Sequence, residues 1–408
     1  MFSNRAANDP ELEADMKFPE RFSNLPEYAF PRLRTLLDGI APGGEPILMT
    51  IGEPRHPFPE WVGEVLAGSL EGFGRYPLND GEPALQSAIA DWINKRYDLD
   101  LRADSNVLPL SGTREGLFNA CLALCPETKN GVKPVVLMPN PFYQVYAVAA
   151  LAVGAEPMYI EANDATGNLP DYGALAVEVL NRVAVAYICS PANPQGAVAD
   201  RNYWTQLITL AEQYDFQIFA DECYSEIYRD TAPVGALQIA TEMGAHPERV
   251  VIFHSLSKRS NLPGLRSGFA AGGPDSIQRL KQLRAYGGAP LPTPLQAVAQ
   301  RAWSDETHVI ENRALYAEKF AICDEVLGSV QGYQSPEAGF FLWLPVDDAE
   351  EATIRLWRET GVKVLPGSYL ARTVEGHTPG SDRIRVALVA PKEETRRGLI
   401  QLRDCLYG

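Results

Sequence analysis

The sequence has little of the chemistry that marks a metalloprotein or a disulfide-stabilised scaffold. Only five of its 408 residues are histidine, and none stands in the H-E-x-x-H pattern of a zinc protease. The six cysteines are scattered along the chain, and no paired set of cysteine or histidine completes a zinc site. Several lie inside apolar stretches, which is typical of reduced core residues in a cytoplasmic protein. We therefore expect neither a bound metal nor a disulfide framework.

Long apolar runs and an excess of positive charge are also missing. The longest apolar run, residues 145–155, is too short to span a bilayer, and the N-terminus lacks the apolar core of a secretory signal. Lysine and arginine number 36 against 52 aspartates and glutamates, which gives a formal net charge of −16. Such a surface repels phosphate backbones and anionic lipid, so we expect neither nucleic acid nor membranes as partners. An anionic small substrate would need a locally basic pocket.

Short apolar runs alternate with helical patterns through most of the first 290 residues. Helical spacing is clear over residues 82–97 and recurs at 115–124, 143–153 and 203–214. Buried strands are predicted at 135–138, 157–160, 183–189, 217–220 and 250–254. This alternation of strands and helices predicts a mostly parallel sheet that helices cover on both faces.

The pattern changes after about residue 290. Helices are predicted at 307–327, 353–359 and 393–406, and strands at 340–344, 362–365 and 384–389, with Gly361 placed to end the second helix. We expect three parts. Residues 1–48 form an N-terminal arm, with a helix near 32–37, and part of a small domain. Residues 49–290 form a large domain, and residues 291–408 form the small C-terminal domain.

Lys258 is the first candidate for chemistry, in the motif S-L-S-K at 255–258. A lysine directly after a buried strand can be desolvated, which lowers its pKa and frees the amine for Schiff-base chemistry. The serine hydroxyls and Arg266, eight residues on, could hold a phosphate. S-x-x-K also occurs in serine acyl-enzymes, but their S-D-N and K-T-G partners are missing here. A solvated loop lysine remains the alternative for so short a motif.

Asp221 ends the strand predicted at 217–220, and active-site residues of open α/β sheets lie at such carboxyl ends. A buried aspartate needs a cationic or hydrogen-bonded partner. A protonated pyridine nitrogen is such a partner, and the pairing strengthens the ring as an electron sink. The alternative is a helix N-cap.

Three further motifs follow predicted strands or begin helices. Gly112 and Thr113 begin a helical pattern, where free N–H groups bind anions, although an ordinary N-cap has the same composition. Asn193 lies in a turn between two prolines, and Tyr143 could stack on a planar cofactor or pack in the core. No glycine-rich loop of the Walker or dinucleotide type competes with this set.

In this order the motifs SGT, PFY, SPANP, DECY, SLSK and GLR resemble the fold type I, class I/II pyridoxal-phosphate-dependent aminotransferases over nearly the whole chain. The resemblance is sharpest for the N-succinyldiaminopimelate aminotransferases of lysine and diaminopimelate biosynthesis. The segments that carry it are YPLNDG from Tyr76, PNPFYQVY from Pro139, DECYSEIY from Asp221, SLSKRSNLPGLRSG from Ser255 and RIRVALV from Arg383, together with GEPRH at 52–56 and FPRLRTLL at 30–37. It implies an aspartate-aminotransferase-like α/β fold, with a mostly parallel seven-stranded sheet covered by helices and a smaller α/β domain.

The resemblance also implies a role for each residue around the cofactor, pyridoxal 5'-phosphate. Lys258 carries the cofactor as an aldimine and shuttles the proton. Asp221 pairs with the pyridine nitrogen, Tyr224 and Asn193 hydrogen-bond the ring hydroxyl, and Tyr143 stacks on the ring.

The same resemblance implies that four residues bind the phosphate of the cofactor, and that a fifth residue has a less certain contact with it. The four are Gly112, Thr113, Ser255 and Arg266, and Arg114 matches a more variable position of the motif.

Substrate and partner residues are implied in the same way. Arg385 binds the substrate's α-carboxylate with Gly52 near it. Arg383 is an alternative on the same face of the strand, but the family pattern favours Arg385. Tyr76 reaches the phosphate of a neighbouring subunit, so a homodimer with shared active sites is expected.

The implied reaction is a ping-pong transfer between an amino acid and a 2-oxo acid, with N-succinyl-LL-diaminopimelate and 2-oxoglutarate as the expected pair. An aminotransferase of other specificity (aspartate, alanine or aromatic) is the main alternative. A carbon–sulfur β-lyase and a regulatory domain fused to a DNA-binding module are further ones. Arg32, Arg34, Arg55 and Arg114 are candidates to bind the remote carboxylate, and the sequence does not choose among them.

Overall fold

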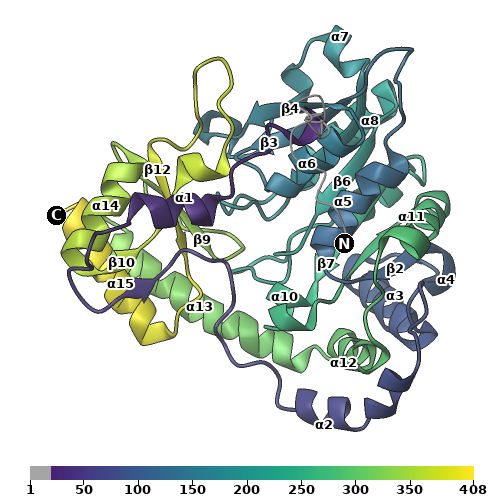
Figure 1. Cartoon of the computed structure of the whole chain (residues 1–408), viewed down its shortest axis with the longest axis horizontal. Coiled ribbons are helices and arrows are strands. Elements are labelled where there is room, and N and C mark those ends of the chain that lie inside the picture. The colour runs from purple at the N-terminus through teal and green to yellow at the C-terminus, as the bar shows by residue number, and fades with distance from the viewer. Residues whose placement is uncertain (1–19) are drawn as a thin grey trace, which may run out of the picture.

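A seven-stranded sheet organises the larger part of the molecule in the computed structural model, which describes residues 20–408 (Figure 1). The strand order is β2-β8-β7-β6-β5-β3-β4, and only β8 runs antiparallel to its neighbours. The strands are β2 (Val107–Leu110), β3 (Val135–Asn140), β4 (Glu156–Glu161), β5 (Val183–Cys189), β6 (Gln217–Asp221), β7 (Val250–Ser255) and β8 (Gly268–Gly272). The expected mostly parallel seven-stranded sheet is thus confirmed.

Two of these strands, β2 and β8, have no counterpart among the strands read from the sequence pattern. β2 is four residues long and contains Pro109, which is tolerated because β2 is an edge strand. β8 has a glycine at each end. A Cβ at Gly268 would lie 2.6 Å from the carbonyl oxygen of His254, and one at Gly272 would lie 2.7 Å from that of Val250. These glycines let β8 lie close to β7, but they hide the strand from a pattern search.

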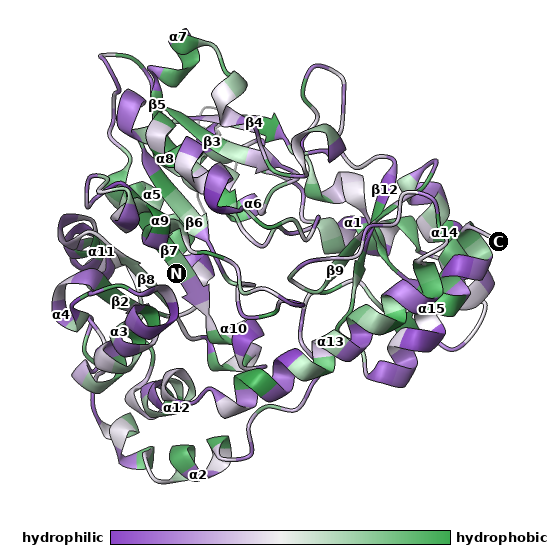
Figure 2. Cartoon of the chain, turned by 180° about the vertical axis from the view of Figure 1, so that it is seen from behind, coloured by the Kyte–Doolittle hydropathy of each residue, from purple (hydrophilic) through white to green (hydrophobic). Residues whose placement is uncertain are grey.

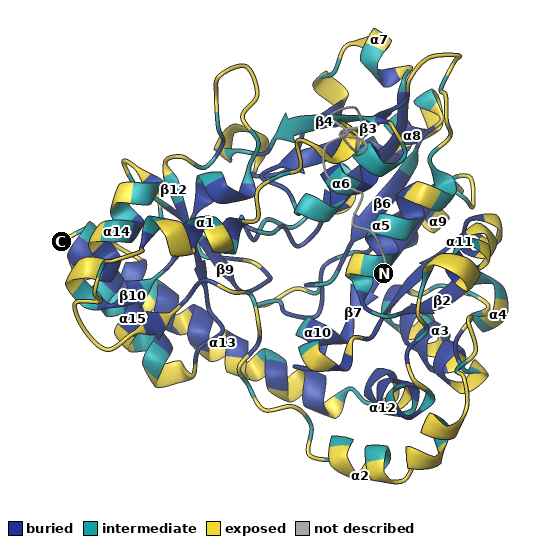
Figure 3. Ribbon diagram, viewed as in Figure 1, coloured by how far each residue is buried: buried dark blue, intermediate teal, exposed yellow. Residues whose placement is uncertain are grey.

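Helices cover both faces of this sheet, as expected. One face carries α5 (Thr113–Leu124), α6 (Gln144–Ala152) and α11 (Pro274–Gly287). The other carries α3 (Pro83–Tyr97), α8 (Arg201–Tyr214) and α9 (Ala236–Glu242), with α12 (Thr293–Ser304) packed on α3. Alternate strand residues feed the two cores: Phe219 and Phe253 face the first group of helices, and Ile218 and Ile252 face the second. The strands are accordingly buried on both sides, except for the edge strand β4, which is half-buried (Figure 3).

A second, smaller unit follows along the chain. Its antiparallel sheet has the order β11-β12-β9, and a separate parallel pair joins β1 to β10. The strands are β1 (Ile47–Leu48), β9 (Phe341–Pro345), β10 (Val362–Lys363), β11 (Leu365–Pro366) and β12 (Arg383–Ala387). The single strand expected at 362–365 is therefore wrong in detail, because the chain leaves one sheet and enters another at Val364. Gly361, at φ 83°, ends the preceding helix as expected.

Three long helices complete the smaller unit. They are α13 (Thr307–Leu327), α14 (Ala349–Thr360) and α15 (Lys392–Leu406). The helix α15 is amphipathic and buries Leu399, Leu402 and Cys405, whereas α13 buries polar residues such as Asn312 and Lys319 together with apolar ones (Figure 2). The helix α13 begins near the large sheet, beside α10 (Leu256–Arg259), and ends inside the smaller unit (Figure 1).

The N-terminal segment lies with the smaller unit. Leu33 on α1 (Ala29–Leu36) packs against Leu365 and Tyr369, and β1 pairs with β10. The part of the expected arm at residues 1–19 lies outside the described residues, and the domain boundaries at 48 and 290 stay predictions.

The remaining elements are short. They are α2 (Val62–Ala67), α4 (Ala103–Asn106), α7 (Val177–Leu180) and the 3-10 turns η1 (Glu20–Phe22), η2 (Leu70–Gly74), η3 (Asp164–Thr166), η4 (Tyr172–Ala174), η5 (Pro263–Leu265) and η6 (Gly367–Leu370). None of the helices within residues 20–408 combines the length and apolarity needed to span a bilayer. All six cysteines are free thiols, and in the same residues no cluster of three or more His, Cys, Asp or Glu could hold a metal ion.

Candidate active site

A cavity of about 230 Å³ opens where the parallel strands β3, β5, β6 and β7 end. Its lining brings together residues that are far apart in sequence, as expected for the carboxyl ends of a parallel sheet. The predicted site residues that line it are Thr113, Arg114, Tyr143, Asn193, Asp221, Tyr224, Ser255, Lys258 and Arg266. Gly112, Gly52 and Arg385 adjoin this set through the contacts described below, and Tyr76 does not.

One end of the cavity is built to receive an anion. Gly112 is the N-cap of α5 at φ 89°, and a Cβ there would lie 2.3 Å from Nη2 of Arg266. Only glycine therefore lets this guanidinium approach the free N–H groups at the start of α5. Thr113 is the first helical residue, and the Ser255 hydroxyl accepts a hydrogen bond from the Ser257 N–H at 3.1 Å. Helix N–H groups, hydroxyls and a guanidinium in one place suit a phosphate group.

Lys258 lies on the short helix α10, directly after β7. Its Nζ donates to the carbonyl of Gly52 and lies 5.4 Å from the centre of the Phe340 ring. Burial lowers the pKa of Lys258 from 10.5 to about 8. The amine of Lys258 is thus neutral more often near physiological pH than the amine of an exposed lysine. The neutral form is the one that attacks a carbonyl group.

Asp221 ends β6 with its side chain 6% exposed. Its Oδ2 accepts a hydrogen bond of 2.8 Å from the Tyr146 hydroxyl, and Oδ1 accepts a longer one of 3.4 Å from the Cys223 N–H. Within residues 20–408 no lysine or arginine forms an ion pair with it. Burial raises the pKa of Asp221. A buried carboxylate that faces a cavity without a cationic partner suits the protonated nitrogen of an aromatic ring.

Tyr146 is a functional candidate that the sequence did not reveal. It is fully buried, and its ring stacks on Tyr187 with the centroids 4.5 Å apart. Burial raises its pKa well above 10, so the hydroxyl stays protonated and always donates to Asp221. The two residues are 75 positions apart, and the packing of α6 on the sheet brings them together.

Arg385, on β12, is 3% exposed. Its Nη1 donates to Oδ1 of Asn193 at 2.9 Å, and its Nη2 donates to the carbonyl of Thr50 at 2.6 Å. Its Nε is buried without a partner, and no carboxylate of the described chain pairs with it. Burial lowers its pKa to about 10, so it remains charged near neutral pH. A buried guanidinium without an acidic partner suits a carboxylate ligand.

Arg383, the alternative on the same strand, is engaged elsewhere. It forms ion pairs of 2.9 Å with Asp164 and 3.1 Å with Asp382, whereas Arg385 bonds Asn193 of the cavity lining. Of the two arginines, Arg385 is thus the one that contacts the cavity lining and has no acidic partner within the described residues.

The aromatic residues surround these charged groups. Tyr224 is 9% exposed, and Phe340 lies edge-on to its ring, with the centroids 5.3 Å apart. The Tyr143 hydroxyl accepts a hydrogen bond from Nε of Arg114 at 2.8 Å. A Cβ at Gly52 would lie 2.6 Å from the Phe341 ring, which explains a glycine where the chain passes Lys258. Cys223 also lines the cavity, with its Sγ 3.2 Å from the Thr113 hydroxyl, and the sequence pattern did not single it out.

The mouth of the cavity carries Arg114, which is exposed apart from its contact with Tyr143. Its Nη2 also donates to the Tyr28 hydroxyl, at 3.5 Å, from the N-terminal segment. Of the four arginines that could bind a remote carboxylate, only Arg114 lines this cavity.

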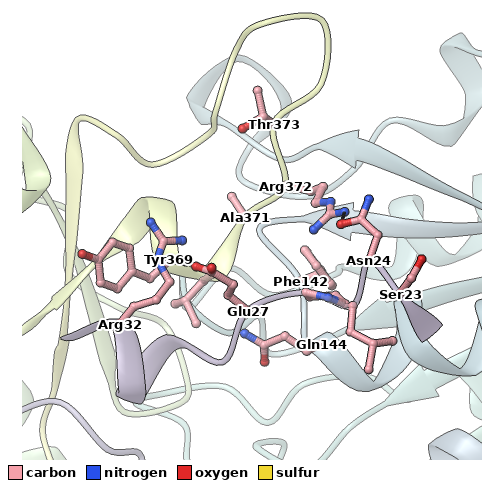
Figure 4. A pocket seen from close by; sticks show the side chains of 13 residues that line it. Ser23, Asn24, Glu27, Arg32, Phe142, Gln144, Tyr369, Ala371, Arg372 and Thr373 are labelled. Atoms are coloured by element: carbon pink, nitrogen blue, oxygen red, sulfur yellow. Dashed lines mark hydrogen bonds and ion pairs between the residues drawn. The ribbon is translucent and has the colours of Figure 1, made fainter. Parts of the chain in front are cut away.

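The other three arginines lie elsewhere. Arg32 lines a separate cavity of about 610 Å³, where its guanidinium lies 3.8 Å over the Tyr369 ring and pairs with Glu27 (Figure 4). Arg55 pairs with Glu394 at 2.8 Å, and Arg34 is exposed on α1.

Tyr76 is the one predicted site residue that stands apart. It is 98% exposed, and it does not contribute to the cavity of its own chain. Several large apolar neighbours in the same stretch, Leu70, Phe73 and Leu78, are also more than half exposed.

Comparison with known proteins gives a consistent picture. The family model for aminotransferase class I and II matches residues 45–401. The LL-diaminopimelate aminotransferase of Dehalococcoides mccartyi is 32% identical over 95% of this chain and 98% of its own length. The structure of an aminotransferase from Neisseria meningitidis superposes with a TM-score of 0.89, at 39% identity over 94% of this chain and 99% of that one. A probable N-succinyldiaminopimelate aminotransferase from Thermus thermophilus superposes with a TM-score of 0.80, at 26% identity over 93% and 100% of the two chains.

Proposed function

Because the chain belongs to the class I and II aminotransferases, which use pyridoxal 5'-phosphate, we propose that it transfers amino groups in lysine and diaminopimelate biosynthesis. The proposed pair is N-succinyl-LL-diaminopimelate and 2-oxoglutarate, in a ping-pong reaction. The names of the Dehalococcoides and Thermus proteins support a diaminopimelate-type substrate.

The proposed roles of the residues follow from the groups that each presents to the cavity. When bound, pyridoxal phosphate supplies an electron sink for the negative charge that develops at the substrate's Cα. Gly112, Thr113, Ser255 and Arg266 would hold the phosphate, and Asp221 would hold the ring nitrogen in its protonated form. The anion-binding end and the unpaired buried carboxylate described above support this assignment.

Lys258 would carry the cofactor and move the proton at the substrate's Cα. Its lowered pKa supports both tasks, because each needs a neutral amine. Tyr143 would pack on the ring, and Tyr224 and Asn193 would hydrogen-bond the ring hydroxyl. Arg385 would orient the α-carboxylate, and its hydrogen bond to Asn193 would set the distance between substrate and ring.

The charge balance of the cavity is the observation that carries the choice of substrate. The charged groups that line it are Arg114, Lys258 and Arg266 against a single acid, Asp221. The remote end of N-succinyl-LL-diaminopimelate carries carboxylates and a neutral amide, whereas the remote end of free LL-diaminopimelate also carries an ammonium. Arg114 at the mouth could bind a remote carboxylate, but the lining has no second acid for an ammonium. A cationic mouth on a chain of net charge −16 therefore favours the succinylated substrate.

LL-Diaminopimelate itself is the second candidate. The observation that favours it is the 32% identity to the Dehalococcoides enzyme over nearly the full length of both chains.

A panel of amino donors with 2-oxoglutarate tests both candidates on the purified protein. The donors are N-succinyl-LL-diaminopimelate, LL-diaminopimelate, aspartate, alanine and phenylalanine, and kcat/KM is measured for each. We expect the succinylated compound to exceed LL-diaminopimelate by at least about tenfold. A preference for LL-diaminopimelate would replace the first candidate by the second. A preference for aspartate, alanine or phenylalanine over both by about a hundredfold would remove the pathway assignment but not the family.

We also propose a homodimer in which Tyr76 completes the phosphate site of the partner. Its exposure of 98% and its absence from the cavity of its own chain support this role. Mixing Tyr76→Phe subunits with Lys258→Ala subunits should then restore a fraction of the active sites, because one hybrid site contains both native residues. A monomer in light scattering, or hybrids that recover no activity, would contradict the shared site.

A further inference from the structure

A buried amide joins the lysine-bearing turn to the rest of the site. Asn312, on α13, is 4% exposed and does not line the cavity. Its Nδ2 donates to the carbonyls of Lys258 at 3.3 Å and Arg259 at 3.4 Å. Its Oδ1 lies 3.0 Å from Nδ2 of Asn261 and 3.0 Å from Nδ1 of His56. One side chain thus uses both of its donor hydrogens and both of its acceptor positions.

The two carbonyls to which the Asn312 amide donates belong to the end of α10. A helix of four residues leaves its last carbonyls without intrahelical partners, and here the chain turns away at Asn261 with φ 52°. Asn312 supplies the missing donors from a different helix. The position of the Lys258 backbone is therefore set by α13 as well as by β7.

The oxygen of the same amide contacts the segment 50–56, which includes the backbone partners of Arg385 and Lys258. The carbonyl of Thr50 accepts from Arg385, and the carbonyl of Gly52 accepts from Lys258. His56, four residues on, reaches back to Asn312, and its ring lies 4.7 Å from the Tyr316 ring. Burial lowers the pKa of His56 to about 4, so the ring is neutral and its Nδ1–H can donate to the Asn312 oxygen.

We propose that Asn312 is a positioning residue that holds the amine of Lys258 in register with the segment 50–56. It does not line the cavity. It acts by fixing the backbone at Lys258 and the segment 50–56 relative to each other, through its bonds to the Lys258 carbonyl and to His56. The inference rests on the proposed role of Lys258.

The test compares two forms of the cofactor on the apoprotein. Pyridoxal phosphate condenses with the lysine amine, whereas pyridoxamine phosphate, which has an amine in place of the aldehyde, does not. Dissociation constants for both are measured by quenching of tryptophan fluorescence. Asn312→Ala should raise the constant for pyridoxal phosphate about tenfold and that for pyridoxamine phosphate less than about threefold. The ratio of the two constants is independent of a general loss of stability, because both are measured on the same folded protein.

Two further variants supply a second test of the proposal and a control. His56→Ala removes one anchor without leaving the α10 carbonyls unpaired, and it should raise the same ratio about threefold. It carries the test if Asn312→Ala gives no soluble protein. Asn94→Ala is the matched control, because that half-buried amide also bonds the backbone twice, at Leu101, but lies on α3 away from the lysine. The control should leave the ratio unchanged.

A kinetic readout checks the same point with substrate. In the half-reaction with glutamate, Asn312→Ala should increase the primary isotope effect of α-deuteration, because a displaced amine makes proton transfer more rate-limiting. An unchanged ratio and an unchanged isotope effect in both Asn312→Ala and His56→Ala would overturn the proposal.

The failure of the proposed role of Lys258 would look different. If Lys258 does not bond the cofactor, Lys258→Ala alone should leave the ratio of the two constants at its wild-type value. If it does, Lys258→Ala should abolish the preference for pyridoxal phosphate, and adding Asn312→Ala should then change nothing further.

Discussion

The floor and the mouth of the cavity differ in how their charges are held. On the floor, Asp221 and Arg385 are almost fully buried. Asp221 accepts hydrogen bonds from the Tyr146 hydroxyl and from the nearby Cys223 N–H, and Arg385 donates one to Asn193 and one to the Thr50 carbonyl. At the mouth, Arg114 is exposed and held only by two tyrosine hydroxyls. Burial shifts the pKa of Lys258, Asp221 and Arg385 on the floor.

This difference indicates which region suits bond-breaking chemistry and which suits recognition of the substrate. A desolvated charge interacts strongly and can be tuned by its neighbours, so the floor suits bond-breaking chemistry. An exposed charge is screened by water and salt, so the mouth suits recognition of a remote carboxylate at a modest gain. Substitutions on the floor should therefore change rates by orders of magnitude, and substitutions at the mouth should change the preference among substrates.

Lys258→Ala should have the largest effect. Transamination should fall below detection while the fold is retained, because one amine has both proposed tasks. The measurement is turnover of glutamate with 2-oxo acids, together with the visible absorbance that pyridoxal phosphate gains on bonding a lysine.

Lys319→Met is the matched control for that variant. Lys319 is another buried lysine, with its Nζ bonded to the carbonyl of Leu388 at 3.0 Å, but it lies outside the cavity. It should keep both the absorbance and the turnover. Near-native turnover of Lys258→Ala without added amine would contradict the proposed role of Lys258.

Asp221→Ala should rank second, with a loss of several orders of magnitude in the half-reaction rates. The ring nitrogen would lose its only charged partner in the cavity, and the electron sink would weaken. Stopped-flow measurement of each half-reaction checks this. A fall of less than about tenfold, or ~1.4 kcal/mol, would contradict the ion pair.

Tyr146→Phe should have an intermediate effect, a loss of about tenfold, because it removes one hydrogen bond to a charged group. Affinity for a cofactor analogue in which carbon replaces the ring nitrogen separates the causes. If Tyr146 acts through Asp221, the variant should weaken binding of the natural cofactor more than binding of this analogue. Equal losses for both would reduce Tyr146 to a packing residue.

Arg114→Ala probes the mouth. We expect kcat/KM for N-succinyl-LL-diaminopimelate to fall about fivefold to tenfold, with less than about a twofold change for alanine, which has no remote carboxylate. Arg34→Ala on the exposed face of α1 is the control and should change neither. Equal losses for both substrates would mean that Arg114 serves the cofactor and not the remote carboxylate.

The smallest effect concerns pH. Since burial lowers the pKa of Lys258 from 10.5 to about 8, its protonated form is disfavoured in the folded apoprotein. The stability of the apoprotein should therefore rise as pH increases through about 8 toward 10.5, and this lysine should contribute no slope below that window. Acetylation of Lys258, followed by mass spectrometry across pH, should show a midpoint near 8.

Charge removal distinguishes floor from mouth in the same experiment. Arg385 is one of the cations that lower the pKa of Lys258, whereas Arg114 is exposed at the mouth, where water and salt screen its charge. Arg385→Leu should raise the midpoint and Arg114→Ala should leave it in place. A shift in the opposite order would break the distinction between the two regions.

Strand and helix positions could be predicted wherever the pattern was strong. The run at 183–189 and the helix at 307–327 agree with β5 and α13 to the residue. A strand buried on both faces must be apolar throughout, and in α13 the buried apolar residues Val309, Tyr316, Phe320, Cys323 and Leu327 recur at helical spacing, so each leaves a local signal. The strands β2 and β8 leave no such signal. Pro109 is compatible with β2 only because that strand lies at an edge, and the glycines of β8 are needed only because β7 lies so close.

By itself the sequence determined which residue types stand after which strands. That was enough to bring Lys258, Asp221 and Asn193 to one edge of a sheet, because the carboxyl ends of parallel strands meet there. It could not decide which partner each of them would have. The Tyr146 hydroxyl on Asp221, the Asn312 amide under Lys258 and the choice of Arg385 over Arg383 depend on contacts between segments 54 to 192 residues apart or on the pairing of one strand face. Only the tertiary structure decides such contacts, because hydrogen bonds depend on distances of a few ångströms that no spacing along the chain records.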